Sequence, residues 1–371
     1  MKCHKCLSDN NLRDRTNGRC PRCSHQIVFD PRRTNDPFND IQFSKTLELI
    51  SPGGTIKFND MQFYYFLNSR RIGKFEFLGC LSFIFLPLMV FLLFVGTSQK
   101  APAILSLLFT LFSLYLVIVL FTVLNNQKDK FRHRIKWPYK MVKDSLSRWE
   151  SANGLLGALL PEPSKSIPAT ADVPKEILDY SFDRLIVTQS DDIAQFLIAN
   201  NFHFENNCAV LSINQYPYTL FDIVMKMLRN NENLKVYTLH DASWKGLCML
   251  DKLKNEKIWF AEQPSAQIID LGLVPRQFEK RKAFIEKSYE SQSASELSDS
   301  VKNSLSATEI KWLDEGNVVR VESIAPRALL RLITAGIATS RDPDKKDALV
   351  PVDSGSGDTG GIYVFTGDSF G

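Results

Sequence analysis

Four cysteines near the amino terminus are the clearest group of residues that could do chemistry. Cys3 and Cys6 form one CxxC pair, and Cys20 and Cys23 form a second pair after a spacer of thirteen residues. Two such turns can bring four thiolates to one tetrahedral zinc ion. With four protein ligands no position is left for water, so the sequence predicts a structural zinc ribbon over residues 1–30. A pair of redox-active dithiols is the alternative reading of the same spacing.

Two adjacent tyrosines, Tyr64 and Tyr65, are the second candidate group. They lie in the run MQFYYFLNSRR, which has a helical pattern and polar residues before it that could cap a helix. A further helical pattern over Asp40–Ile50 and a short strand, TIKF, precede this run. Together they predict a small helical or winged-helix-like segment over residues 38–74. Packing against neighbouring elements is the ordinary role of a tyrosine pair on such a helix.

Polar residues also follow a series of predicted buried strands. The runs RLIVT (184–188), AVLSI (209–213) and KVYTL (235–239) are each followed by a helical pattern, and KIWF (257–260) is a candidate fourth strand. Strands that alternate with helices predict a parallel sheet covered on both faces. In such sheets the functional residues lie at the carboxyl ends of the strands. These residues are Gln189, Ser190, Asp191, Asn214, His240, Asp241 and Ser243.

The region 175–337 resembles a Toprim domain, and specifically that of the topoisomerase VI family and its meiotic double-strand-break relatives. After the third strand, the sequence HDASWKG matches the acidic DxDxxG-like pattern of that family at Asp241 and Gly246. It departs from the pattern where Ser243 replaces the second acid. Gln189 also stands where the family has a glutamate. Because magnesium prefers several anionic oxygens, these departures predict a domain that has lost catalysis.

The segment GTIKFNDMQFYYFL resembles the winged helix that carries the catalytic tyrosine in the same family. The resemblance implies that Tyr64 or Tyr65 occupies the position of the nucleophile. If the domain retained activity, Tyr64, Tyr65 and Asp241 would therefore be the catalytic candidates. Magnesium would be the cofactor only in that case.

Two uncharged apolar runs separate the amino-terminal elements from the predicted sheet. Phe77–Val95 has nineteen residues and Ala103–Leu124 has twenty-two. A helix needs about 20 apolar residues to cross the hydrocarbon core of a bilayer. Neither run has the polar face that a helix buried in a soluble protein normally keeps. The sequence therefore predicts a transmembrane helical hairpin over residues 75–124.

Basic residues flank this predicted hairpin on both sides. Arg70, Arg71 and Lys74 precede it, and basic juxtamembrane helices are expected over residues 126–160, whereas the connecting loop has only Lys100. The positive-inside rule then predicts two spans with both termini in the cytosol. The compact architecture favours a bacterial plasma membrane.

The remaining composition sets few limits on function. The net charge of +4 is too small to argue for nucleic acid by itself. Residues 340–371 are rich in Gly, Ser and Asp and have few apolar residues, which predicts a disordered tail.

The sequence thus predicts an α/β protein with a four-cysteine zinc ribbon, a transmembrane hairpin and a parallel-sheet, Toprim-like cytosolic domain. The expected function is a membrane-anchored adaptor or scaffold that meets the lipid bilayer and binds a cytosolic protein or nucleic acid. The alternative is a membrane-tethered, magnesium-dependent nuclease or DNA strand-transfer enzyme. A transport role is disfavoured because the two spans carry no charged residue. The oligomeric state is not predicted.

Overall fold

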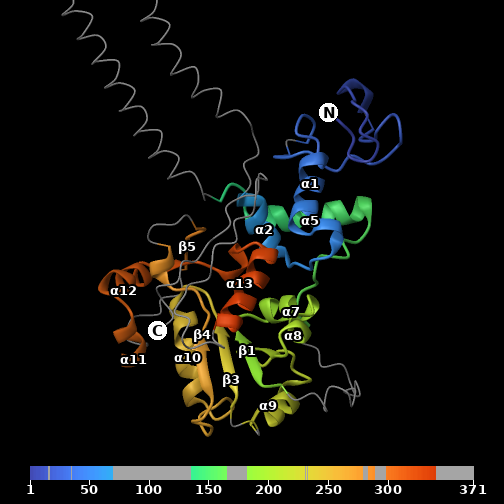
Figure 1. Ribbon diagram of the computed structural model, residues 1–371. Coiled ribbons are helices and arrows are strands. Elements are labelled where there is room, and N and C mark those ends of the chain that lie inside the picture. The colour runs from blue at the N-terminus through green and yellow to red at the C-terminus, as the bar shows by residue number, and fades with distance from the viewer. Residues whose placement is uncertain are drawn as a thin grey trace, which may run out of the picture. The chain divides into compact units, whose positions relative to one another are not determined.

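The computed structural model describes residues 1–15, 17–34, 36–69, 135–164, 182–229, 231, 233–278, 283–288 and 298–339 (Figure 1). The chain divides into two compact units, one formed by residues 1–67 together with 135–371, and the other by residues 68–134. All of the described residues except Asn68 and Ser69 belong to the first unit.

A four-stranded parallel sheet is the centre of the carboxyl-terminal part of this unit. Its strands are β1 (Arg184–Thr188), β2 (Ala209–Ser212), β3 (Lys235–Leu239) and β4 (Gln267–Asp270). Their order across the sheet is β2-β1-β3-β4, and all neighbours are parallel. The predicted parallel sheet is confirmed for its first three strands. The fourth strand follows the segment 257–260 rather than containing it.

Apolar side chains cover both faces of the sheet, because successive residues of a strand point to opposite sides. Ile186 and Tyr237 pack on one face with residues of α7, α8 and α13. Leu185 and Val236 pack on the other face with residues of α9 and α10. The helices are α7 (Asp191–Ala199), α8 (Phe202–Glu205), α9 (Phe221–Arg229), α10 (Trp244–Asn255) and α13 (Pro326–Thr339).

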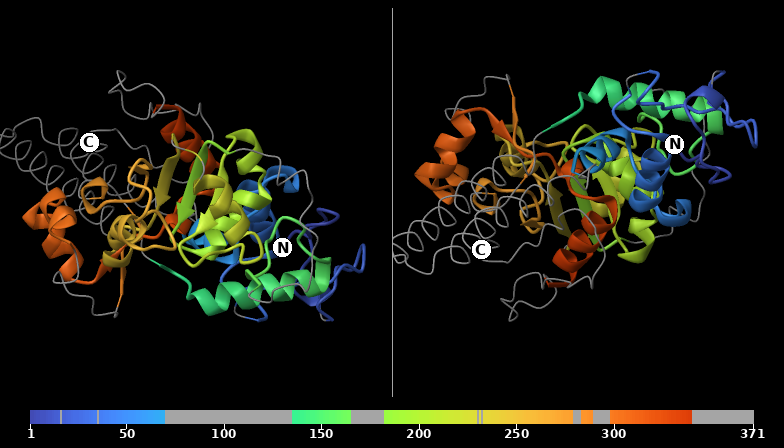
Figure 2. Two further views of the ribbon diagram at one scale, coloured as in Figure 1. Left: turned by 90° about the horizontal axis from the view of Figure 1, so that it is seen from below. Right: turned by 90° about the horizontal axis from the view of Figure 1, so that it is seen from above.

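Short helices build the amino-terminal part around an aromatic core. Its elements are η1 (Arg13–Arg15), α1 (Asp40–Ile50), η2 (Pro52–Gly54), α2 (Asp60–Ser69) and α5 (Tyr139–Asn153). The ring of Phe43 in α1 lies 5.3 Å from that of Phe63 in α2 and 5.2 Å from that of Trp149 in α5. In both views of Figure 2, α5 in green lies beside the blue amino-terminal elements, although it follows α2 at a distance in the sequence.

The sequence starts α1 and α2 in the same way. Asn39 and Gln42 bond each other's backbone N–H groups at the start of α1, which is a capping box. Asn59 and Gln62 do the same at the start of α2. The predicted cap before the tyrosine pair is therefore Asn59.

The chain after the sheet returns to its carboxyl edge. Its elements are η3 (Pro275–Gln277), β5 (Glu286–Lys287), α11 (Asp299–Ser304), α12 (Ala307–Asp314), β6 (Asn317–Val318) and η5 (Val321–Ser323). Strands β5 and β6 pair antiparallel, and a single bridge joins Val319 to Ala242, just beyond the end of β3. Residues near 286 and 320 are thereby brought to the site predicted at Asp241.

The prediction of a membrane protein needs correction. Within the described ranges, no helix has both the length and the apolar character needed to cross a bilayer. Residues 75–124, where the sequence predicts the hairpin, and residues 126–134 of its basic flank lie outside those ranges, as does the tail at 340–371. The fold class of the described residues is therefore mixed α/β with a four-stranded parallel sheet and without a membrane hairpin. The predicted location, a two-span protein of a bacterial plasma membrane with cytosolic termini, is withdrawn with it.

Candidate functional site

The four amino-terminal cysteines converge on one point. The sulfur atoms of Cys3, Cys6, Cys20 and Cys23 all lie within 4.8 Å of one another. Cys3 Sγ is 3.8 Å from Cys23 Sγ, and Cys6 Sγ is 3.6 Å from Cys20 Sγ. Four thiols gathered at this spacing suit a tetrahedral metal ion bound by protein ligands alone. The convergence predicted from the two CxxC pairs is therefore present, and the cluster could hold a metal ion.

Each CxxC pair forms a tight backbone turn that points its sulfurs inward. The N–H of Leu7 donates to the carbonyl of Cys3 at 3.0 Å, and the N–H of Ser24 donates to that of Cys20 at 2.8 Å. Leu7 and Ser24 take up left-handed backbone conformations, with φ of 57° and 56°. The two turns thus share one geometry, so the ribbon presents two equivalent pairs of ligands.

The electrostatics of the cluster also fit a cation. The Ser8 hydroxyl, which donates toward the sulfur, lowers the pKa of Cys20 to about 5. The backbone N–H of His25 lowers the pKa of Cys23, but burial and the three other sulfurs outweigh it and raise that pKa to about 12. Some thiolates form easily here, whereas the last one is opposed by its neighbours. A bound cation removes this repulsion, because thiolates are the metal-binding form of cysteine.

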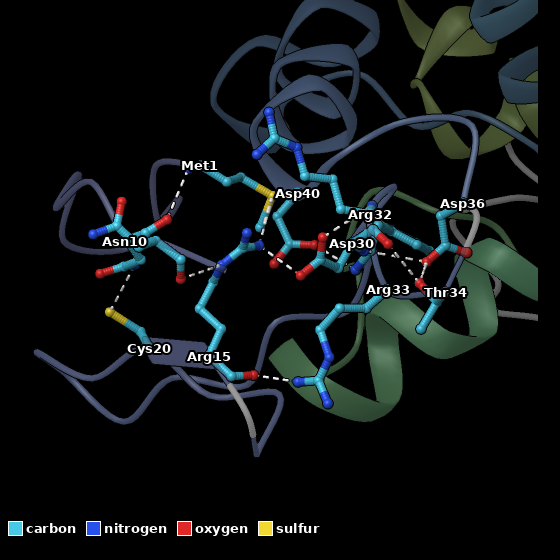
Figure 3. A network of polar contacts seen from close by, with 12 residues as sticks. Met1, Asn10, Arg15, Cys20, Asp30, Arg32, Arg33, Thr34, Asp36 and Asp40 are labelled. Carbon is cyan, nitrogen blue, oxygen red and sulfur yellow. Dashed lines mark hydrogen bonds and ion pairs between the residues drawn. The ribbon is translucent and has the colours of Figure 1, made fainter. Parts of the chain in front are cut away.

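A polar network behind the cysteines holds the ribbon together (Figure 3). The guanidinium of Arg15 pairs with the carboxylate of Asp30 at 2.5 Å, and both side chains are buried. The amide of Asn10 donates to Cys20 Sγ at 3.5 Å. Asp40, at the start of α1, accepts the backbone N–H groups of Val28 and Phe29 at 3.2 and 2.7 Å. The ribbon is therefore bonded to the first helix as well as to itself.

Helix α5 fixes the ribbon from a second side. Arg148 donates to the carbonyl of Val28 at 2.7 Å and pairs with Asp36 at 2.8 Å. The indole of Trp149 contacts the ring of His4, between the first two cysteines, at 4.9 Å between centroids. The ribbon and the helical segment therefore share a core, so loss of a metal would also disturb the helices.

A second candidate site lies at the carboxyl edge of the sheet between β1 and β3. The chain runs from β1 to β2 on one side and returns to β3 on the other, and such a switch point leaves a crevice at the strand ends. The N–H of Asp241 donates to Gln189 Oε1 at 2.8 Å. A cavity of about 190 Å³ opens here. Its lining includes Gln189, Asp241, Ser243, Trp244, Lys245, Glu286, Lys287, Asn317 and Arg320.

Tyr65 reaches this site through Glu286. Its hydroxyl donates to Glu286 Oε1 at 2.7 Å, and Arg320 Nε donates to the other oxygen of Glu286 at 3.3 Å. Tyr65 is 1% exposed, and burial together with the charge of Glu286 raises its pKa well above the usual range. Tyr64 instead packs against Tyr139, with 5.7 Å between ring centroids. Of the two predicted tyrosines, Tyr65 is the one joined to the site of Asp241.

Three charged residues at this site were not predicted from the sequence. Glu286, Arg320 and Glu322 come from the segments around β5 and β6. Glu322 is 7% exposed, its Oε1 accepts the hydroxyl of Ser190 at 3.1 Å, and its Oε2 has no hydrogen-bond partner. Burial and the charge of Asp241 raise the pKa of Glu322 to about 8. The signal in the sequence is the pair of charges inside the apolar run NVVRVESIAP.

These carboxylates do not form a metal site. In the described parts of the chain, the four cysteines are the only group of three or more His, Cys, Asp or Glu residues whose ligand atoms lie that close together. Asp241 Oδ1 accepts the N–H of Val321 at 2.8 Å. The residues predicted as catalytic candidates are therefore near one another, but they take part in hydrogen bonds within the protein.

A buried ion pair lies below Asp241. His240 is fully buried, its Nε2 is 3.0 Å from Asp270 Oδ1, and its Nδ1 is 2.9 Å from the carbonyl of Asp241. Burial lowers the pKa of His240, but the charge of Asp270 outweighs it and the net shift is upward. Because both ring nitrogens face acceptors, the charged imidazolium suits this position best. The pair thereby fixes the backbone that carries Asp241.

Comparisons with family models, with curated proteins and with solved structures find no match to this chain.

Proposed function

We propose that this protein is an adaptor that binds a nucleic acid or a protein partner through a zinc-stabilised ribbon, and that its α/β domain has no metal-dependent catalysis. The observation that carries the proposal is the convergence of the four cysteines as the one group of metal ligands among the described residues. Zinc is the metal we propose because a closed site of four thiolates is typical of structural zinc. A site without an open position supports binding rather than chemistry at the metal.

The surface of the ribbon supports an anionic partner. Asp9 and Asp14 are its exposed acidic side chains, and Asp9 pairs with the amino terminus at 3.0 Å. The exposed basic side chains of the ribbon and its following turn are Lys2, Lys5, Arg13, Arg19, Arg22, Arg32 and Arg33. Basic side chains gathered in this way attract phosphate groups without sequence preference.

Fluorescence anisotropy with labelled single- and double-stranded DNA and RNA tests this surface. The variant Lys5→Ala/Arg22→Ala should weaken binding about tenfold and lower the slope of log affinity against log salt by about 2. Lys252→Ala/Lys254→Ala, exposed near the end of α10, removes the same charge as a control and should bind as the wild type does. If both variants bind alike, the ribbon is not the nucleic-acid surface, and a protein partner is the remaining choice.

A second candidate function is a magnesium-dependent nuclease or DNA strand-transfer enzyme. The observation that favours it is the gathering of Tyr65, Glu286 and Asp241 around one cavity. DNA incubated with the full-length protein and Mg²⁺ or Mn²⁺ should stay intact under the adaptor proposal. Cleavage, or a covalent protein–DNA product, that disappears in Asp241→Ala and Tyr65→Phe would replace the adaptor with this enzyme.

A further inference from the structure

We propose that the cavity between β1 and β3 binds a small phosphomonoester that carries a hydroxyl group, such as a sugar phosphate. This site is separate from the ribbon and does not depend on the adaptor proposal. It holds the ligand with side chains and backbone groups of the protein, without a metal ion.

The size of the cavity limits the ligand. Its volume of about 190 Å³ is below the roughly 300–1,000 Å³ of pockets that enclose drug-sized molecules. It nevertheless far exceeds the space of a single water molecule, about 30 Å³. A compact ligand of a few polar groups fits this space, whereas a folded partner or a base stack does not.

The cations of the cavity favour a doubly charged anion. Lys245, Lys287 and Arg320 line it, and they face two acidic residues, Asp241 and Glu286. Glu286 is already satisfied, since it accepts the hydroxyl of Tyr65 and the Nε of Arg320. The excess of positive charge is thus directed at the cavity and suits a phosphate dianion better than a single carboxylate.

The start of α10 adds a backbone contribution. Ser243 caps this twelve-residue helix, and Ser243, Trp244 and Lys245 all line the cavity. The first N–H groups of a helix have no partner inside the helix, and together with the helix dipole they bind phosphate well. Gly246 allows this helix start to approach closely, because a Cβ atom there would lie 2.2 Å from the carbonyl oxygen of Asp241.

A buried carboxylate indicates that the ligand also has a hydrogen-bond donor. Asp241 lines the cavity and is 8% exposed. Its Oδ1 accepts the N–H of Val321, while no residue in the described ranges donates to its Oδ2. A buried carboxylate oxygen without a donor is costly. A ligand hydroxyl satisfies it, which a bare phosphate ion cannot do as well because its charge opposes that of Asp241.

Trp244 gives a second sign of a missing polar group. It is 7% exposed, and its indole Nε1–H has no hydrogen-bond partner among the described residues. Indole N–H groups in protein interiors normally find an acceptor. An unsatisfied donor and an unsatisfied acceptor in the wall of one cavity point to a ligand that carries both kinds of group.

Isothermal titration of the full-length protein with ribose 5-phosphate, inorganic phosphate and ribose tests the proposal. Ribose 5-phosphate should bind at least about tenfold more tightly than either fragment, with no need for added Mg²⁺. Lys245→Ala should weaken its binding about tenfold or more. Lys257→Ala, which removes a lysine that is 86% exposed and outside the cavity, should leave it unchanged.

Asp241→Asn gives an independent readout. It should reduce the preference for ribose 5-phosphate over inorganic phosphate, since it removes both an acceptor for the hydroxyl and a charge that repels the bare ion. If this variant does not fold, the comparison of Lys245→Ala with Lys257→Ala still decides. The proposal is wrong if ribose 5-phosphate binds no better than inorganic phosphate, if its binding requires Mg²⁺, or if both lysine variants behave alike.

Discussion

Glu322 is a buried carboxyl group whose environment favours the protonated form. Its neighbours are the hydroxyl of Ser190, which donates to Oε1, and the charge of Asp241. Burial is the larger cause of its raised pKa, and the repulsion from Asp241 adds to it. At neutral pH the folded protein therefore keeps a proton on Glu322 that the unfolded chain releases.

This difference predicts how Glu322→Gln changes stability with pH. The pKa of Glu322 rises from an ordinary 4.5 to about 8 on folding. Between these values only the unfolded state loses the proton, so the wild type becomes less stable as the pH rises. The amide does not titrate, so the variant should gain on the order of 2–4 kcal/mol relative to the wild type from pH 5 to pH 8. Urea unfolding at several pH values measures this. Glu205→Gln, at an exposed position, should show no such gain.

A second residue-scale prediction concerns the pair of His240 and Asp270. Removing one partner of a buried pair leaves an uncompensated charge, so His240→Ala should lower the free energy of unfolding by about 3 kcal/mol. Lys257→Ala breaks an exposed pair with Glu262 at 3.6 Å and should cost at most about 1 kcal/mol. Equal losses in the two variants would show that His240 contributes no more than a surface charge.

The pH dependence of the His240 effect follows from its two pKa shifts. The raised pKa of His240 means that its stabilisation is complete below the ordinary value of 6.5 and is lost as the pH rises through the raised value. Burial raises the pKa of Asp270, but the charge of His240 outweighs it and brings the value down to about 2, so its stabilisation is present above 3.8 and lost toward pH 2. The cost of His240→Ala should therefore be largest between about pH 4 and pH 6.5. A flat profile across that range would contradict the ion pair.

At the scale of elements, the start of α10 and the ends of β1 and β3 are packed without spare room. A Cβ atom on Gly246 would lie 2.2 Å from the carbonyl oxygen of Asp241 and 2.9 Å from Gln189 Oε1. These atoms belong to the edge of the sheet and to a hydrogen-bonded amide, so they cannot move aside easily. The helix must shift instead.

Gly246→Ala should therefore destabilise the protein by about 1–3 kcal/mol and disturb the cavity. Gly157→Ala is the control, because a Cβ atom there would meet nothing within 4 Å. Urea denaturation of both variants measures the difference. A Gly246→Ala protein as stable as the control would mean that α10 is not held against the sheet as the structure has it.

Most strands of the sheet could be predicted because their signal is local. The runs at β1, β2 and β3 are short, apolar and buried on both faces, and Ser190 and Ser243 cap the helices that follow β1 and β3. The fourth strand was placed wrongly at 257–260. Trp259 and Phe260 are buried there, but in a turn, so their apolar character reflects burial rather than a strand.

The candidate site could be predicted only in part, for the same reason. Asp241 follows a recognisable strand, so the edge of the sheet identifies it. Glu286 and Arg320 reach the site through the pairing of β5 with β6 and the bridge between Ala242 and Val319. These pairings join distant parts of the chain and have no signal in the local sequence. Tyr65 depends on a contact with Glu286, 221 positions away.

At the scale of the whole molecule, the described unit joins its amino-terminal and sheet parts through polar contacts. The side chain of Asn200, at the end of α7, accepts from the N–H of Lys57 at 2.9 Å and donates to its carbonyl at 3.1 Å. The backbones of Phe58 and Leu159 form a parallel bridge nearby. The ribbon is bonded in turn to α1 and α5. Changes at the ribbon can therefore reach the helices that contact the sheet.

The central claim is that the four cysteines hold a metal ion, and measurement of the metal in purified full-length protein tests it most directly. Mass spectrometry of the metal content should find one ion per chain in the wild type. Cys248→Ala, which changes a cysteine of α10 outside the cluster, should keep that ion, whereas Cys20→Ser should lose it. A wild-type protein without metal, or a Cys20→Ser protein with unchanged metal content, would contradict the claim.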